Sequence, residues 1–175
     1  DWSSDVCSSD LALVANSRGS SQTGSATWTS GTNAYDGTYG TTTNTYASLS
    51  TSATSWITVA GYGFNTSIID LSDVNTLSVS FRCYVTTASR WTSIVMQPYL
   101  GTTAIGTSFT AGSVPTTGTT FSTTFTNITR SQIEDPTFGI RVTYNKSGGA
   151  TDVIYFDFAD VSVDYSIEQW ESLYL

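Results

Sequence analysis

Few side chains in this sequence could carry acid–base or nucleophilic chemistry. Histidine is absent, which removes the commonest general base, the Ser-His and Cys-His pairs and the usual zinc ligand. Of the two cysteines, Cys83 lies within an alternating pattern, where a lone cysteine is typically a small buried apolar residue. Nucleophilic catalysis is therefore not expected.

The carboxylates do not form a convincing catalytic pair. Glycoside hydrolysis needs two carboxyl groups about 5–9 Å apart across a cleft, one of them with a raised pKa. The period-2 pattern points Asp157 and Asp160 to opposite faces of a strand. Asp70 and Asp73 lie in a predicted loop, and Glu134 and Asp135 lie beside a proline. We therefore predict that the chain is not an enzyme.

Asp157 is the acid most in need of an explanation. It lies within a predicted strand whose inward face is otherwise apolar, and an unpaired buried carboxylate is costly. Arg82 and Arg141 lie on candidate neighbouring strands, and backbone groups of a loop could serve instead. The pattern favours a structural, hydrogen-bonded aspartate, with a metal ligand or a polar binding pocket as the alternative.

The aromatic residues are the second hint of a site. Sugar-binding sandwiches use exposed Trp and Tyr side chains as platforms, and the same residues are favoured in protein interfaces. The alternative is that Trp28, Trp56 and Trp91 cap the core at the two ends of the fold. The candidate ligand-binding residues are Tyr39, Trp56, Tyr62, Trp91 and Tyr99.

Strands must position these side chains. Alternation of apolar and polar residues is clearest over 74–86, 138–144 and 153–165, and such a period of two indicates strands with one face on a core. Weaker strands are expected over 26–29, 45–50, 55–64, 90–100, 104–109 and 119–127, and a helical turn capped by Thr129 over 129–136. The fold class is therefore all-β, a two-sheet antiparallel sandwich.

The last of these strands has apolar residues on both faces from Val153 to Phe158. A strand covered on both faces is central in its sheet. We therefore expect 153–164 to lie mid-sheet, paired with 74–86 or with 138–144.

The two ends of the chain differ in character from the middle. Residues 1–11, DWSSDVCSSDL, resemble the translation of a sequencing-library adapter, which implies a metagenomic assembly and an N-terminus that is missing. Residues 12–25 are expected to be a linker or the end of a truncated upstream segment, with 17–25 flexible. The domain is predicted over 26–166, followed by a tail, 167–175, for which truncation is one of the alternatives.

Composition excludes some partners. Six lysines and arginines cannot neutralise a phosphate backbone, so nucleic acid is not expected as a partner. The sequence lacks the long apolar run that a membrane span needs. Serine and threonine make up 59 of the 175 residues, a bias frequent in secreted and virion-borne proteins.

Five motifs in order carry a resemblance to a known family. They are WTSGTNAYDGTY at 28–39, AGYGF at 60–64, LSVSFR at 77–82, FGIRV at 138–142 and YFDFADVSVDY at 155–165. This order resembles the jelly-roll modules of phage virion and tail-associated proteins and of bacterial surface proteins. The resemblance implies jelly-roll topology. The stretch after Phe64 departs from it, because the expected proline-glycine turn is absent.

The NAYDG string also resembles the loop of galactose-binding-like domains, where an aspartate and nearby carbonyls hold a structural calcium ion. Calcium takes six to eight oxygen ligands. By this resemblance the ligands would come from Asp36, Thr41, Thr43 and Asp157. The alternative is an ordinary Asp-Gly turn, in which the aspartate bonds its own backbone. No cofactor is required in either case.

These observations predict a non-catalytic structural or adhesive module of a phage virion, a tail appendage or a bacterial surface protein. The alternative is a carbohydrate-binding module, free or as an accessory domain of a glycoside hydrolase. The partners would be virion or surface proteins, or cell-surface glycans, and the setting would be a virion surface or the extracellular space.

Overall fold

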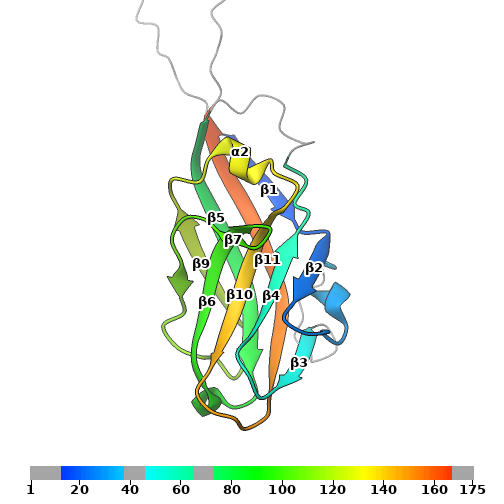
Figure 1. Ribbon diagram of the computed structural model, residues 1–175. Coiled ribbons are helices and arrows are strands. Elements are labelled where there is room, and N and C mark those ends of the chain that lie inside the picture. The colour runs from blue at the N-terminus through cyan, green and yellow to red at the C-terminus, as the bar shows by residue number, and fades with distance from the viewer. Residues whose placement is uncertain (1–12, 38–45, 65–72, 167–175) are drawn as a thin grey trace, which may run out of the picture.

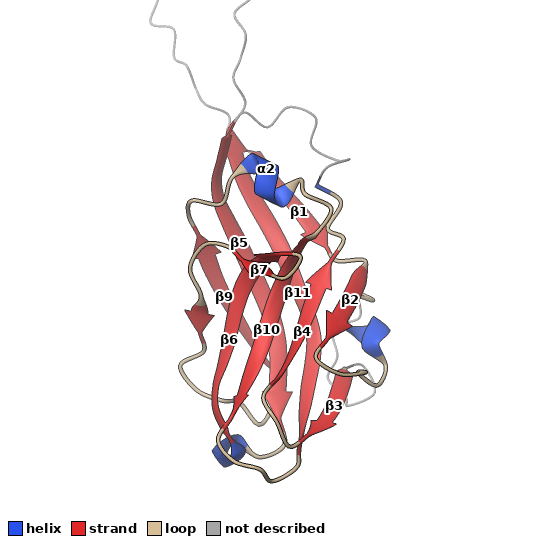
Figure 2. Cartoon of the chain, in the orientation of Figure 1, coloured by secondary structure: helices blue, strands red, loops and turns tan. Residues whose placement is uncertain are grey.

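The computed structural model describes residues 13–37, 46–64 and 73–166, and these form two antiparallel sheets packed face to face (Figures 1 and 2). The five-stranded sheet has the order β1-β11-β5-β9, and β3 also pairs with β11. Its strands are β1 (Leu13–Arg18), β3 (Ala47–Thr51), β5 (Asp73–Val85), β9 (Thr119–Phe125) and β11 (Asp152–Ser166). The two-sheet antiparallel sandwich predicted from the sequence is confirmed, and the arrangement is consistent with a jelly roll.

The six-stranded sheet lies in front of the other in the view of Figure 2. Its order is β2-β4-β10-β6-β7, and β8 also pairs with β6. The strands are β2 (Ser21–Gly24), β4 (Ser55–Ala60), β6 (Trp91–Leu100), β7 (Thr103–Ala104), β8 (Phe109–Thr110) and β10 (Phe138–Lys146). The predicted strand over 104–109 is therefore two short strands.

The core fills the space between the sheets. Buried and more exposed residues alternate along most of each long strand, as the period-2 patterns predict. Burying one such side chain stabilises the fold by about 1.5–3 kcal/mol. The largest fully buried side chains include Leu77, Phe81 and Phe156 from one sheet and Ile57, Met96 and Ile140 from the other. Cys83 is buried among them, which raises the pKa of its thiol to about 12 and confirms its role as a small apolar residue.

A β-bulge in β11 corrects one detail of the predicted pattern. β11 pairs with β5, as expected, but the register shifts between Phe156 and Phe158. Phe156 faces the core on one side of the bulge and Ala159 on the other, so the core-facing parity changes at Asp157. Asp157 therefore does not share a face with Val161, and the apolar residues on both faces of this segment reflect the bulge.

The N-terminal segment is also corrected. Residues 17–25 were expected to be a flexible linker, but the chain forms β1 over Leu13–Arg18 and β2 over Ser21–Gly24. β1 pairs with β11 in one sheet, and β2 pairs with β4 in the other. Residues 26–29, expected to form a strand, make only an isolated bridge from Thr29 to Ser48.

Three short helical turns complete the described structure: η1 (Gly31–Ala34), η3 (Ala88–Arg90) and α2 (Arg130–Ile133). Thr129 caps α2 as predicted. Its hydroxyl accepts from the backbone N–H of Gln132, whose side chain accepts from the N–H of Thr129. No helix in the described ranges is long and apolar enough to span a membrane.

Candidate functional site

The outer face of the five-stranded sheet carries a row of side chains that point away from the core. Residues of β5 and β11 stand opposite one another on this face, because alternate residues of each strand point away from the core. Successive pairs change in character along the sheet from hydroxyl to charged to aromatic. These pairs are Ser78 with Ser162, Ser80 with Asp160, Arg82 with Phe158, and Tyr84 with Tyr155.

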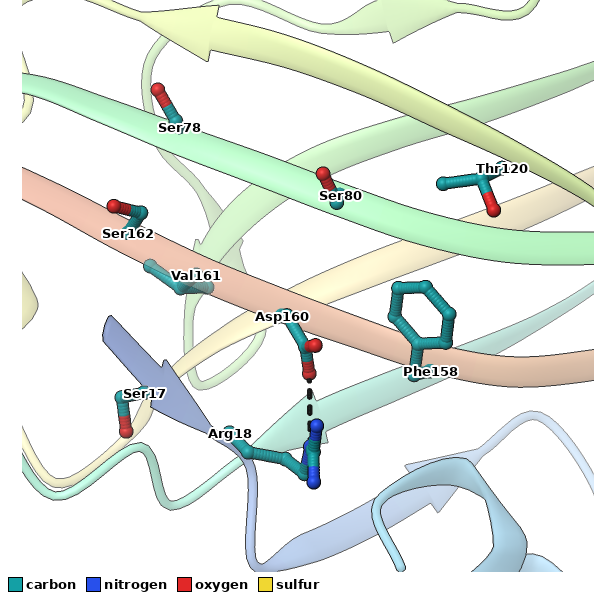
Figure 3. Close-up of a pocket in the computed structure, with 9 residues that line it drawn as sticks. All are labelled: Ser17, Arg18, Ser78, Ser80, Thr120, Phe158, Asp160, Val161 and Ser162. Carbon is teal, nitrogen blue, oxygen red and sulfur yellow. Dashed lines mark hydrogen bonds and ion pairs between the residues drawn. The ribbon is translucent and has the colours of Figure 1, made fainter. Parts of the chain in front are cut away.

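An open groove of about 640 Å³ follows the first part of this line. Its lining residues come from β1, β5, β9 and β11, and Figure 3 shows Arg18 on β1 reaching toward Asp160 on β11. Phe158 is the aromatic residue of the lining. The lining residues are Ser17, Arg18, Ser78, Ser80, Thr120, Phe158, Asp160, Val161 and Ser162.

Hydroxyl groups form one side of the groove. The Ser80 hydroxyl lies 2.6 Å from that of Ser122, and the Ser78 hydroxyl lies 3.2 Å from that of Thr124. These bonds link β5 to β9. A hydroxyl has one donor and two acceptor positions, so each retains capacity for a second partner. The side of the groove formed by β5 and β9 can therefore both donate to a ligand and accept from it.

An ion pair supplies the charges of the groove. Arg18 Nε lies 3.2 Å from Asp160 Oδ1, and both side chains are more than a quarter exposed. Such an exposed pair contributes little to stability, about 0–1 kcal/mol. The pair therefore places charge of both signs on the wall of the groove while contributing little to the fold.

Three tyrosines lie beyond the groove on the same face. The rings of Tyr84 and Tyr155 stack with centroids 4.3 Å apart and planes at 7°, and Tyr46 meets Tyr84 edge-on at 5.0 Å. Burial raises the pKa of Tyr84 to about 12, so its hydroxyl stays protonated. Gly118 allows this packing, since a Cβ there would lie 2.3 Å from the Tyr46 hydroxyl oxygen.

Asp157 lies between the tyrosines and the groove. It is 1% exposed, and Arg82 Nε approaches Oδ2 to 3.8 Å. Of the two arginines that the sequence offers, Arg82 is therefore the partner, whereas Arg141 lies in the other sheet. The close guanidinium favours a structural role for Asp157, because a cation already faces the carboxylate.

Two predicted ligand-binding residues belong to the core instead. Tyr62 is 5% exposed, and its hydroxyl donates to the carbonyl of Ala159 at 2.9 Å. Trp91 is equally buried, and its indole N–H donates to Asp152 at 2.7 Å. Neither ring can serve as an exposed platform. The alternative prediction of core tryptophans is confirmed for Trp28 and Trp91.

Trp56 and Tyr99 are half-buried on the outer face of the six-stranded sheet, on the other side of the molecule from the groove. Their rings do not stack as a coplanar pair, since the guanidinium of Arg141 lies against both. Tyr39, the remaining predicted ligand residue, lies outside the described residues.

The predicted calcium site is only partly within the described structure. Asp36 is exposed just after η1, Asp157 faces Arg82, and Thr41 and Thr43 lie outside the described residues. Within 13–37, 46–64 and 73–166, no three His, Cys, Asp or Glu side chains come together as a metal site would require. The calcium ion stays a prediction.

Several of the acids considered and rejected as a catalytic pair have structural partners. Asp160 pairs with Arg18, and Glu134 pairs with Arg130 at 2.8 Å. Asp135 accepts from the backbone N–H and the hydroxyl of Thr137, and these bonds lower the pKa of its carboxyl. The prediction that the chain is not an enzyme stays a prediction.

No protein-family model and no curated protein sequence matches the chain. Among solved structures, it is similar to a family 35 carbohydrate-binding module from Clostridium thermocellum, at 14% identity and a TM-score of 0.43, over 85% of this chain and 97% of that one. It is also similar to the C-terminal family 6 module of a marine laminarinase from Zobellia galactanivorans, at 10% identity and a TM-score of 0.42, over 86% and 99%. These likenesses concern the fold.

Proposed function

We propose that this chain is a non-catalytic glycan-binding module, and that a sugar chain lies in the groove on the five-stranded sheet. The observation that carries the proposal is the lining of that groove. Serine and threonine hydroxyls and one exposed ion pair line an open groove of about 640 Å³, in which the largely buried ring of Phe158 leaves a small apolar area. This is the alternative predicted from the sequence, now assigned to different residues.

The chemistry of the lining matches that of a sugar. A pyranose presents hydroxyls around its edge and an apolar patch of C–H groups on its face. The hydroxyls of Ser78, Ser80 and Ser162 can each donate and accept, while the Phe158 ring, 9% exposed, adds only a small apolar area to the groove. A groove open to solvent accepts the middle of a chain as well as its end. Neutral polysaccharides are therefore the ligand class proposed for this site.

The other sequence-based predictions remain secondary. A glycan ligand accords with an extracellular setting, and the proposal requires neither a metal ion nor a catalytic group. The virion or surface structural role draws no support from the groove and stays a prediction.

The test is retention in native gels that contain soluble neutral polysaccharides such as xylan, mixed-linkage β-glucan, mannan and galactan, followed by calorimetry with the matching oligosaccharide. We expect at least one of these to retard the protein. Ser162→Gln places a larger side chain in the groove without touching the core, and we expect binding at least about tenfold weaker, a loss of about 1.4 kcal/mol.

Thr103→Gln is the matched control, because it makes the same kind of change on an exposed strand of the other sheet. It should bind like the unmodified protein. Failure of every neutral polysaccharide, or equal binding by the Ser162 and Thr103 variants, would overturn the assignment of the groove.

A further inference from the structure

Arg141 has an unusual environment on the outer face of the six-stranded sheet. Its guanidinium carbon lies 4.1 Å from the ring centroid of Trp56 and 3.9 Å from that of Tyr99. The register explains this arrangement. Trp56 on β4 pairs with Thr143 and Tyr99 on β6 pairs with Gly139, so the rings approach Arg141 from opposite diagonals.

These contacts hold the guanidinium in place. Its Nε–H donates to the hydroxyl of Thr58 at 2.9 Å, and two aromatic rings restrict the rest of the group. No acceptor within the described residues takes a bond from Nη1 or Nη2, and neither is among the buried polar atoms. The group is thus fixed at one nitrogen and open to solvent at the other two.

Among the residues that the structure describes, the charge of Arg141 also lacks a counter-ion. The other four arginines, Arg18, Arg82, Arg90 and Arg130, each pair with a carboxylate within 4 Å. Over the described ranges Arg141 has no such pair and contacts rings instead. The guanidinium of Arg141 is thus held by two rings and a hydroxyl, and no carboxylate of the described residues neutralises its charge.

We propose that Arg141, Trp56 and Tyr99 form a second binding site, which takes the carboxylate of an acidic sugar within a polysaccharide. The two free nitrogens of a guanidinium match the two oxygens of a planar carboxylate. The exposed part of either ring can pack against the sugar that carries the carboxylate. A ligand with only a carboxylate would contact only the guanidinium, and a neutral sugar would contact only the rings.

This site does not depend on the groove. The two lie on outer faces of different sheets, with the core between them, and they differ in the ligand they select. If no neutral polysaccharide bound in the groove, the proposal for Arg141 would still be tested separately by an acidic polysaccharide. The proposal for the groove is likewise independent of the result for Arg141.

The experiment uses two forms of one polymer, polygalacturonate and its fully methyl-esterified derivative. The backbone is the same in both, and only the free carboxylate differs. We expect polygalacturonate to retard the protein in native gels and the ester to have little effect. Because the chain is acidic, non-specific attraction to a polyanion cannot produce this result.

Three variants locate the binding. Arg141→Gln should bind polygalacturonate at least about tenfold more weakly, as expected when a charge-assisted pair is lost. Arg141→Lys keeps the charge but not the two-pronged geometry, and should also weaken binding. Arg130→Gln removes one positive charge at α2 and should bind like the unmodified protein. Thermal melting of each variant verifies that it is folded.

Some results would overturn the proposal. These are equal retention by the acid and its ester, no retention by either, full binding by Arg141→Lys, or an equal loss in the Arg130 and Arg141 variants. Loss of binding in Ser162→Gln with full binding in Arg141→Gln would move the acidic ligand to the groove and would likewise contradict it.

Discussion

Asp152 is a buried carboxylate that serves the fold. Burial alone would raise its pKa, but hydrogen bonds from the Trp91 indole and the backbone N–H of Thr87 outweigh this, and the pKa is lowered. A carboxyl group with a lowered pKa in the folded state stabilises the protein above the pKa of the unfolded chain, about 3.9. That stabilisation is lost as the pH falls through the folded-state value.

We therefore expect Asp152→Asn to lower the free energy of unfolding by about 1–2 kcal/mol at pH 7, because the bonds lose their charge-assisted character. The difference from the unmodified protein should be smaller at pH 2 than at pH 7, because protonation of Asp152 at low pH removes the charge from its hydrogen bonds. Urea unfolding at both pH values measures this. An equal difference in the free energy of unfolding at pH 7 and pH 2 would assign the effect to packing rather than to charge.

Single residues were predictable from the sequence where burial alone decides their role. Cys83 follows from its place in the alternation. Asp157 had to have a partner, yet choosing Arg82 over Arg141 requires knowing which strands share a sheet. Trp91 and Tyr62 could not be separated from Trp56 and Tyr99, because an aromatic side chain with a polar tip suits both a core and a surface.

At the scale of elements, the bulge at Asp157 is the feature that shapes the site. One extra residue stands between the stretch of β11 before Asp157 and the stretch from Phe158 to Asp164, each of which pairs residue by residue with β5; a second register shift follows between Asp164 and Tyr165. Removing it leaves every other pair in register and keeps Phe156 and Ala159 facing inward. A deletion elsewhere in the strand turns the rest of the strand inside out.

Deletion of Asp157 should consequently give a protein that still melts cooperatively, with a β-type circular dichroism spectrum. Deletion of Ser162 should not, because it turns Val163 away from the core. Thermal melts of the two deletions, side by side, check this contrast. Loss of cooperative unfolding in both would mean that the carboxylate, and not the register, is what the strand requires.

The bulge also explains which elements the sequence could predict. The long strands follow from their period, and the pairing of 153–164 with 74–86 was among the two expected. When apolar and polar residues alternate before and after one extra residue, the sequence has the same pattern as a strand that is apolar on both faces. The bulge could therefore not be predicted from the sequence. The short strands β1 and β2 have small polar residues over 17–24, typical of a linker, and only pairing with β11 and β4 makes them strands.

For the whole molecule, the two proposed sites lie on opposite outer faces of one sandwich. No shared side chain connects Arg141 with the groove among the residues described. Sites separated by a packed core and without shared partners contribute independently, within about 0.5 kcal/mol. Saturation with a neutral oligosaccharide should therefore change the affinity for polygalacturonate by less than about threefold. Calorimetric titration of one ligand in the presence of the other measures this coupling. A larger change would mean that the ligands compete for one site or that the two sites are coupled.

The antiparallel pairing of β1 with β11 places Leu13 opposite Tyr165, so the chain enters and leaves the described fold at the same end. A mechanical load applied through residues 13 and 166 would pull two adjacent strands apart from that end. The hydrogen bonds between them would then break one after another, as in a zipper, rather than all together in shear. Under tension the five-stranded sheet would therefore separate first between β1 and β11. The groove would lose its shape at the same time, because Arg18 on β1 and Asp160 on β11 both line it.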